Sequence, residues 1–218
     1  MVLLSLAASH HDLDLEVLER LSSDVHAVAS ELVGSTVHRF VSGAVVLATC
    51  NRFELYLEVD DAANTPSARA AAAEAVAGRS GYTAAQVDTH LRVRTGTDAA
   101  AHLFSVASGL DSMVVGEREI QGQVRRALTA ARRDGTTTSG LEALFQAASR
   151  VSRLVESRTG LGATGRSVVG VALDIAEREL PDWSQVRCVL IGTGSYAGAS
   201  LAALKARGAA DIRVYSAS

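Results

Sequence analysis

Two strand-like stretches joined by a three-residue turn constrain this chain more than any other feature. Residues 44–49 form a short apolar run with β-branched valines, and residues 53–59 alternate strictly between apolar and polar side chains. An alternation with a period of two is typical of a half-buried β-strand. The pair predicts a β-hairpin whose tip presents Cys50, Asn51 and Arg52 at one edge of a sheet.

The cysteine at this tip allows two interpretations. It can be a small buried side chain, because free cysteines are among the most buried residue types. It can also be a thiolate nucleophile, since a guanidinium such as that of Arg52 lowers the pKa of a neighbouring thiol and can hold an anionic substrate group. On chemistry alone, Cys50 leaves both interpretations open.

The segments around the hairpin predict an α+β domain. Their order is β-α-β-β-α-β, which favours a ferredoxin-like (split βαβ) sheet with helices on one face. The elements expected are a strand over 2–6, a helix from Asp12 or Asp14 to Gly34, the two hairpin strands, a helix over 66–76 that ends at Gly78, a short helix over 83–91 and a strand over 91–94. Helical periodicity then predicts added helices over 99–108, with Asp98 as N-cap, 117–133 and 139–158.

A glycine-rich stretch, residues 159–165, predicts a linker between a first domain, 1–158, and a second part, 159–218. In the second part we expect a helix over 167–180, a buried parallel strand over 186–191, a helix over 197–207 and a strand over 212–215, as in a Rossmann-type α/β unit.

Glycines follow the expected strand in the pattern Gly192-x-Gly194-x-x-x-Gly198, which departs by one residue from the dinucleotide-binding pattern. Glycines at such a turn can serve tight packing alone. Their place between a strand and a helix favours a turn that holds a pyrophosphate at the helix N-terminus.

Composition narrows the class of protein. The chain has 218 residues and a net charge of −3, which provides no electrostatic footprint for nucleic acid. No stretch approaches the ~18 apolar residues that cross a bilayer, and residues 1–8 lack the positive start of a signal peptide. Cys50 and Cys188 are far apart and have no metal-ligand spacing, so we expect no metal site and a reducing cytoplasm.

Three blocks carry a resemblance to a known family. Residues 49–56, Thr-Cys-Asn-Arg-Phe-Glu-Leu-Tyr, resemble the signature of the glutamyl-tRNA reductases. Residues 102–117, with 121–125 just beyond, resemble a second block of that family, and 189–198 fall where the family has its nucleotide-binding turn. The resemblance covers essentially the whole chain. Because the family's members are considerably longer, it implies the front part of such an enzyme, with the cofactor domain cut short and the third, helical domain absent.

The resemblance implies NADPH-dependent reduction of glutamyl-tRNA to glutamate-1-semialdehyde through a thioester on Cys50, the first step of tetrapyrrole synthesis by the C5 route. His102 would exchange a proton near the thiol, and Arg52 would clamp the carboxylate of the glutamate. The implied substrate positions are Thr49, Asn51, Arg52, Ser112, Glu117, Arg118, Glu119 and Gln123. The implied NADPH positions are Gly192, Thr193, Gly194, Ser195, Tyr196 and Ala197.

One substrate position departs from the family. Glu119 stands where glutamine is common, and a carboxylate there would repel a glutamate side chain unless a cation offsets it. The residues present do not distinguish NAD from NADP, so the choice of NADPH comes from the resemblance.

The resemblance also implies partners: the tRNA, contacted mostly outside this chain, a second copy in a homodimer, and the downstream aminomutase. Taken alone, the chain is expected to reduce little and to hydrolyse the glutamyl ester slowly. Two other classes stay open, a non-catalytic binding or regulatory module of the same fold and an unrelated NAD(P)-linked dehydrogenase. The first would leave Cys50 unreactive, and the second would leave the hairpin unexplained.

Overall fold

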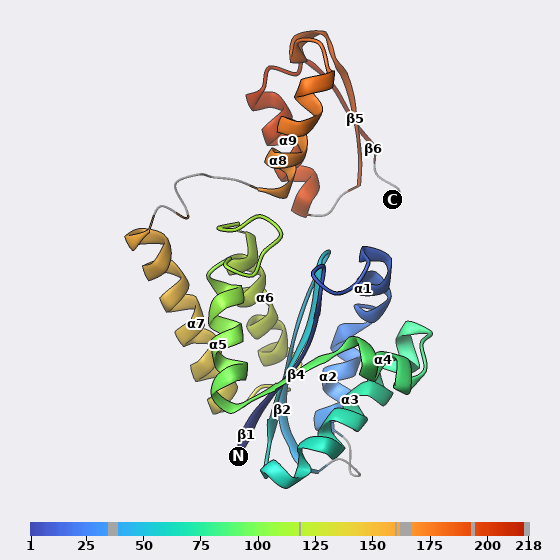
Figure 1. Ribbon diagram of the computed structural model, residues 1–218, viewed down its shortest axis with the longest axis vertical. Coiled ribbons are helices and arrows are strands. Elements are labelled where there is room, and N and C mark those ends of the chain that lie inside the picture. Colours follow the sequence, from blue (N-terminus) through green and yellow to red (C-terminus); the bar gives the residue numbers. More distant parts are fainter. Residues whose placement is uncertain (35–38, 118, 160, 162–166, 193–194, 216–218) are drawn as a thin grey trace.

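A computed structural model of the chain describes residues 1–34, 39–117, 119–159, 161, 167–192 and 195–215 (Figure 1). The first part comprises β1 (Val2–Ser9), α1 (Leu15–Leu21), α2 (Val25–Gly34), β2 (Val41–Thr49), β3 (Arg52–Val59), the 3₁₀ turn η1 (Ala62–Asn64), α3 (Thr65–Ser80), α4 (Ala84–His90), β4 (Arg92–Thr95), α5 (Gly96–Ala107), α6 (Glu119–Arg133) and α7 (Ser139–Arg158). The second comprises α8 (Val168–Ala176), the 3₁₀ turns η3 (Glu177–Glu179) and η4 (Trp183–Gln185), β5 (Arg187–Ile191), α9 (Ser195–Ala206) and β6 (Asp211–Tyr215).

The sheet of the first part has four antiparallel strands in the order β2-β3-β1-β4. β1 and β2 are connected by α1 and α2 and are separated in the sheet by β3. Thr49 pairs with Arg52 across the hairpin, so the turn between the strands consists of Cys50 and Asn51 alone. The predicted hairpin and the α+β class are therefore confirmed, while Arg52 belongs to β3 rather than to the turn.

Each face of this sheet carries its own core. On one face Leu4, Phe53 and Leu55 pack with α1 to α4, and on the other Leu47 and Tyr56 pack with α5, α6 and α7. Figure 1 shows the two groups of helices on opposite sides of the strands. The helices within the β-α-β-β-α-β unit, α1 to α4, lie on one face as predicted, and the added helices α5, α6 and α7 cover the other face. The prediction of a half-buried third strand is wrong, because these added helices cover the face that carries the polar side chains.

Two helix boundaries also differ from the prediction. The single helix expected up to Gly34 is two helices, α1 and α2, and Asp24 between them has a φ of +47°. The break falls at Ser22, Ser23 and Asp24, residue types whose side chains compete with the helical backbone for hydrogen bonds. α5 begins at Gly96 instead of following an Asp98 cap, and Asp98 lies in its first turn, where the helix dipole favours a negative charge.

The second part consists of the parallel strands β5 and β6 with α8 and α9 packed on one face (Figure 1). The predicted parallel pairing is confirmed. The predicted burial of β5 is wrong, because Val189 and Ile191 point to the face without helices and are exposed. The predicted helix over 167–180 ends at Ala176 and continues as a 3₁₀ turn. Most of the predicted linker lies outside the described residues. No helix among the described residues is long and apolar enough to cross a membrane.

The packing of β2 against the start of α7 can be tested at Gly43. A Cβ there would lie 2.5 Å from Thr138 Cγ2 and 3.1 Å from Leu141 Cδ1. We expect Gly43→Ala to lower the free energy of unfolding by about 1–3 kcal/mol, as overpacking does. Gly78→Ala is the control, because nothing lies within 4 Å of the added Cβ in α3, and it should raise stability by up to about 1 kcal/mol. Denaturant titrations measure both, and equal effects would contradict this packing.

Candidate active site

The thiol of Cys50 is exposed at the hairpin tip, so its interpretation as a buried core side chain is wrong. The turn around it is fixed by its own neighbours. Thr49 Oγ1 donates a hydrogen bond to Asn51 Oδ1 at 2.8 Å, and the Asn51 N–H donates back to Thr49 Oγ1 at 3.3 Å. Thr49 and Asn51 therefore hold the two-residue turn that presents the thiol.

Cys50 lies at the end of a groove that follows the free edge of β2 between α2 and α6. We call this the β2 groove, and its volume is about 440 Å³. It is lined by Val25, His26, Val46, Leu47, Ala48, Thr49, Cys50, Gln123, Arg126, Ala127 and Ala130. Of the predicted site residues, the structure thus brings Cys50, Thr49 and Gln123 together.

Arg52 lies in a buried network of charged and polar side chains. Its side chain is 2% exposed. Nη1 donates to Glu54 Oε1 at 2.5 Å, whereas Nη2 donates to the Asp111 carbonyl oxygen at 2.5 Å and pairs with Asp111 Oδ2 at 2.9 Å. His102 Nε2 lies 2.8 Å from Glu54 Oε1, and Tyr56 Oη donates to Glu54 Oε2 at 2.6 Å. Glu54 therefore joins Arg52 and His102, the two predicted partners of the thiol.

The charges of this network are fixed by its surroundings. Burial alone would raise the pKa of Glu54, but the hydrogen bond from His102 and the positive charges of Arg52 and His102 outweigh it and lower the pKa to about 2. Burial raises the pKa of Tyr56 well above its usual value, and the negative charge of Glu54 raises it further. Glu54 is consequently a carboxylate and Tyr56 a neutral hydrogen-bond donor at neutral pH.

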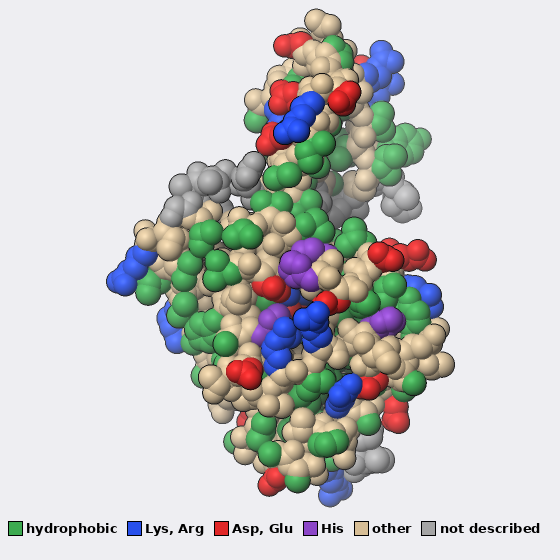
Figure 2. Space-filling model, in the orientation of Figure 1, with side chains coloured by type: hydrophobic (Ala, Val, Ile, Leu, Met, Phe, Trp, Pro, Cys, Tyr) green, Lys and Arg blue, Asp and Glu red, His purple; other side chains and the backbone are tan. Residues whose placement is uncertain are grey.

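A second and smaller hollow, of about 120 Å³, opens onto this network. Arg52, Glu54, His102 and Asp111 line it, together with Ala7, Ala8, Ser9, His11, Asp12, Arg92 and Arg94. Figure 2 shows histidine, arginine and acidic side chains gathered on one face of the first part. Cys50 is not among the lining residues, so the structure brings His102 to Arg52 rather than into the groove of the thiol.

The remaining predicted substrate positions follow α5. Ser112 and Glu117 are buried in the segment between α5 and α6, and Glu119 begins α6 one helical turn before Gln123. Arg118 lies outside the described residues. Sequence reasoning missed Glu54 and Asp111 as site residues. The sequence did contain a signal for Glu54, because it lies two residues from Arg52 and therefore on the same face of the strand. If other elements cover that face, each of these charged side chains needs a partner.

The predicted cofactor turn connects the end of β5 to the start of α9. Gly192 has a φ of +127°, a conformation that favours glycine, and its N–H donates to the Tyr215 carbonyl at 2.9 Å. Thr193 and Gly194 lie outside the described residues, as do the side chains of Ser195 and Tyr196, and Ala197 lies in the first turn of α9. A strand end followed directly by a helix N-terminus is an arrangement that fits a pyrophosphate. Gly198 is not required for packing, because an added Cβ would meet no atom within 4 Å.

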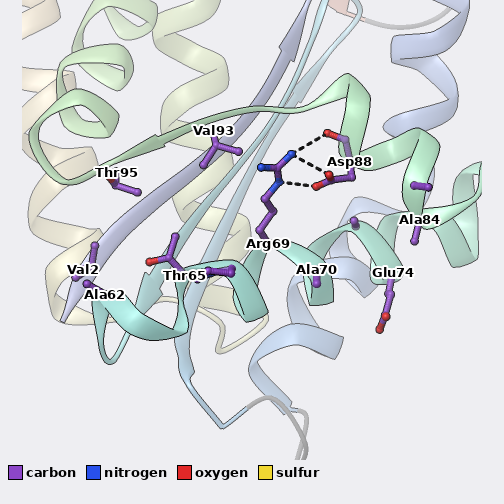
Figure 3. Close-up of a pocket in the computed structure, with 13 residues that line it drawn as sticks. Val2, Ala62, Thr65, Arg69, Ala70, Glu74, Ala84, Asp88, Val93 and Thr95 are labelled. Carbon is purple, nitrogen blue, oxygen red and sulfur yellow. Dashed lines mark hydrogen bonds and ion pairs between the residues drawn. The ribbon is translucent and has the colours of Figure 1, made fainter.

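A larger hollow, of about 720 Å³, lies between α3, α4 and the edge strand β4 (Figure 3). Its one cation, Arg69, points at Asp88 of α4 and is paired with both carboxylate oxygens, at 2.5 and 2.8 Å. None of the predicted site residues lines it. The hollow has no thiol or histidine among its lining residues and its arginine is already paired, so the candidate active site is the hairpin tip with the network beneath it.

Fold and site together define an α+β protein with an exposed thiol at a sheet edge above a buried ion-pair network. The family model for the N-terminal domain of glutamyl-tRNAGlu reductase matches residues 6–159. The glutamyl-tRNA reductase of Clavibacter michiganensis is 54% identical over 99% of this chain and 49% of that protein. That of Pseudarthrobacter chlorophenolicus is 48% identical over 100% of this chain and 49% of that protein.

Among solved structures, the glutamyl-tRNA reductase from Methanopyrus kandleri matches with a TM-score of 0.62 and 28% identity, over 99% of this chain and 49% of that one. The chain belongs to the glutamyl-tRNA reductase family. It spans about half the length of the curated relatives that it matches.

The buried network predicts a specific response to acid. Because the pKa of Glu54 is lowered in the folded state to about 2, its contribution to stability is present above its usual pKa of 4.5 and is lost as the pH falls toward 2. This contribution amounts to about 3 kcal/mol. We expect Glu54→Gln to destabilise the protein at pH 7 by about 3 kcal/mol, because Arg52 keeps its buried charge without its partner.

Urea titrations between pH 7 and pH 3 measure this effect, and Glu54→Gln should also flatten the loss of stability below pH 4.5. Glu142→Gln, which removes a surface ion pair with Arg132, is the control and should change the unfolding free energy little. Parallel curves for the wild type and Glu54→Gln would show that the network does not carry the charges described.

Proposed function

We propose that this chain forms the glutamyl-recognition and acyl-transfer part of an NADPH-dependent glutamyl-tRNA reductase. The observation that carries the proposal is the exposed Cys50 thiol at the end of a groove that Thr49 and Gln123 also line. Family membership supports the same substrate, because the relatives are named glutamyl-tRNA reductases. The product would be glutamate-1-semialdehyde, which enters porphyrin and other tetrapyrrole synthesis.

In the proposed acyl transfer, the sulfur of Cys50 adds to the ester carbonyl carbon of glutamyl-tRNA. The bond from that carbon to the terminal ribose oxygen then breaks, the ribose oxygen takes a proton, and a thioester remains on Cys50. His102 lines the hollow of Arg52 and not the groove of the thiol, so it is proposed to exchange the proton through an intervening water. Since Glu54 engages its Nε2 atom, Nδ1 is left for this role, and Glu54 fixes the orientation of the ring.

Arg52 is proposed to hold the carboxylate of the glutamyl group. Both of its outer nitrogens are engaged, one by Glu54 and one by Asp111. Glu54 is fully buried whereas the Asp111 side chain is 31% exposed, so the substrate carboxylate would replace Asp111 on Nη2. The further substrate contacts that we propose are Thr49, Asn51, Ser112, Glu117, Arg118, Glu119 and Gln123, with Glu119 the least compatible with an acidic ligand.

The reduction step is proposed for a protein with the length of the relatives, since this chain spans about half of them. Bound NADPH would supply the hydride that reduces the thioester. The residues proposed to hold it are Gly192, Thr193, Gly194, Ser195, Tyr196 and Ala197. The backbone of Gly192 and the N-terminus of α9 would contact the pyrophosphate.

Several broader assignments belong to the same proposal. We assign the first sheet to the ferredoxin-like (split βαβ) class on its strand order, and the second part to the Rossmann type on its parallel βαβ unit, with the boundary between residues 158 and 159. A homodimer and contact with the downstream aminomutase are proposed for the full-length protein. The free cysteines Cys50 and Cys188 support a reducing, cytoplasmic compartment.

The nucleophile can be tested without the cofactor. After exposure to glutamyl-tRNA, mass spectrometry of the intact chain should find one added glutamyl group on the wild type and none on Cys50→Ser, because a serine hydroxyl is far less ionised than a thiol. Cys188→Ser is the matched control and should keep the adduct. A glutamyl group retained by Cys50→Ser would reject the assignment. A thiol inert to iodoacetamide would favour the non-catalytic binding module instead.

The carboxylate clamp can be tested by Arg52→Lys, which keeps the charge and removes the planar fork of donors. We expect KM for glutamyl-tRNA to rise at least about tenfold, the loss typical of a charged hydrogen bond. Arg92→Lys, in the same hollow but paired with Asp12 at the surface, should leave KM nearly unchanged. An unchanged KM in an Arg52→Lys protein whose circular dichroism shows it folded would reject the clamp.

A further inference from the structure

The β2 groove contains backbone groups that the sheet does not use. β2 is an edge strand, and the N–H of Ala44 points away from β3 to the Thr136 carbonyl oxygen at 2.7 Å. Outward-facing backbone groups recur at every second residue of a strand, so those of Val46 and Ala48 point the same way. Both residues line the groove, and within the described residues no strand or loop pairs with their outward side. The groove thus offers N–H donors and C=O acceptors to a ligand.

The walls of the groove add a planar ring and a cation. His26, on α2, lies with Nδ1 2.9 Å from Asp134 Oδ2, which fixes the ring while 55% of the side chain stays exposed. Arg126, on α6, is exposed and its guanidinium lies over Gly122, with Nη1 3.2 Å from the position of an added Cβ.

The other arginines near the end of α6 are already engaged. Arg132 pairs with Glu142 and Arg133 pairs with Asp134. In the part of the chain that the structure describes, Arg126 has no such ion-pair partner. The cation at the wall of the groove is therefore available to an anion from outside.

These features together fit a nucleotide better than an amino acid. A nucleobase stacks on histidine rings and guanidinium planes and hydrogen-bonds through its edge, and an adenine presents both a donor and an acceptor there. The groove's apolar side chains, such as Val25, Val46 and Ala127, suit the faces of a base, whereas its polar residues Thr49 and Gln123 are the ones proposed to contact the glutamyl group. Its volume of about 440 Å³ falls in the ~300–1,000 Å³ range of small-molecule sites.

The position of the Cys50 thiol indicates which nucleotide of the substrate would occupy the β2 groove. An acyl carbon under attack lies against the sulfur of Cys50, and the ribose oxygen that leaves is bonded to that same carbon. The leaving group must therefore start beside Cys50, where the groove begins. We propose that the β2 groove binds the 3′-terminal nucleotide of the aminoacylated acceptor end. The base lies between the β2 edge and His26, and a backbone phosphate contacts Arg126. This inference rests on the proposed acyl transfer to Cys50.

The test compares two acyl donors that differ in the nucleotide. Acylation of Cys50 is followed by mass spectrometry of the intact chain with glutamyl-tRNA and with a simple alkyl α-thioester of glutamate. We expect His26→Ala and Arg126→Gln each to raise the half-saturating concentration of glutamyl-tRNA about fivefold or more, as loss of one stacking or phosphate contact does. Neither variant should change acylation by the small thioester, because that donor has nothing to place in the groove.

Three further measurements separate recognition from structural damage. Arg126→Gln should reduce the salt dependence of glutamyl-tRNA binding by about 0.7–0.9 in log–log slope, the loss of one phosphate contact. His26→Phe keeps a ring and should retain more of the tRNA affinity than His26→Ala. Arg153→Gln removes an exposed arginine of α7 outside the groove and should have no effect on either donor.

Each contrary result has a defined meaning. Unchanged half-saturation for glutamyl-tRNA in both variants, or equal losses with both donors, would overturn the nucleotide site and leave acyl transfer to Cys50 intact. Displacement of glutamyl-tRNA by an extended valine-rich hexapeptide but not by adenosine monophosphate would identify the β2 edge as a strand-addition site and also overturn the inference. If the wild type is acylated by neither donor, the proposed function itself fails, and the nucleotide site fails with it.

Discussion

The buried carboxylate of Glu54 is the interaction on which the geometry of the hairpin depends. An isolated charge in the interior costs several kcal/mol, and it is tolerated only when paired and hydrogen-bonded. Here Arg52 comes from the same strand, His102 from α5 and the partner Asp111 from the segment after α5. The carboxylate of Glu54 thus connects α5 and the segment after it to β3, the strand that begins at the hairpin tip. Arg52 also pairs with Thr49 across the hairpin, so the buried network fixes the strand ends that carry the Cys50 turn.

This arrangement separates the exposed thiol from the buried ion pairs. The guanidinium and the carboxylate lie in the interior, whereas the thiol stands on a two-residue turn held by Thr49 and Asn51. The substrate carboxylate and the ester are then proposed to be held by different surfaces, the first on Arg52 and the second in the β2 groove. A glutamyl ester has its carboxylate and its reacting carbonyl at opposite ends, so two separate hollows around one hairpin suit it.

Sequence reasoning succeeded where the signal was local and failed where burial depended on distant elements. The hairpin, the α7 range and the parallel pairing of β5 with β6 follow from patterns within a few residues. The alternation of apolar and polar residues in β3 indicates that one face is exposed to solvent. An alternation with a period of two residues cannot reveal that α5, α6 and α7 cover that face. For the same reason sequence reasoning gives Glu54 no role in the site, and it cannot predict the pairing of Arg52 with Asp111, which are 59 residues apart in the chain. The prediction for β5 was wrong in the opposite direction: a strand predicted to be buried has an exposed face. An apolar sequence does not ensure that a second layer of structure covers both faces of a strand.

The open edge of β2 has a physical significance beyond the sequence pattern. An unpaired strand edge is a template for aggregation, and proteins usually cover it or interrupt it. Here the Thr136 carbonyl oxygen accepts a hydrogen bond from the outward-facing N–H of Ala44, and α2 and α6 contact each other beside the strand. The stretch that stays open lies next to Cys50, between His26 and Arg126, which has no ion-pair partner among the described residues. The ring of His26 and the guanidinium of Arg126 beside this stretch suit a nucleotide rather than another strand. The opening is therefore better explained by a ligand that must end at the thiol than by incomplete packing.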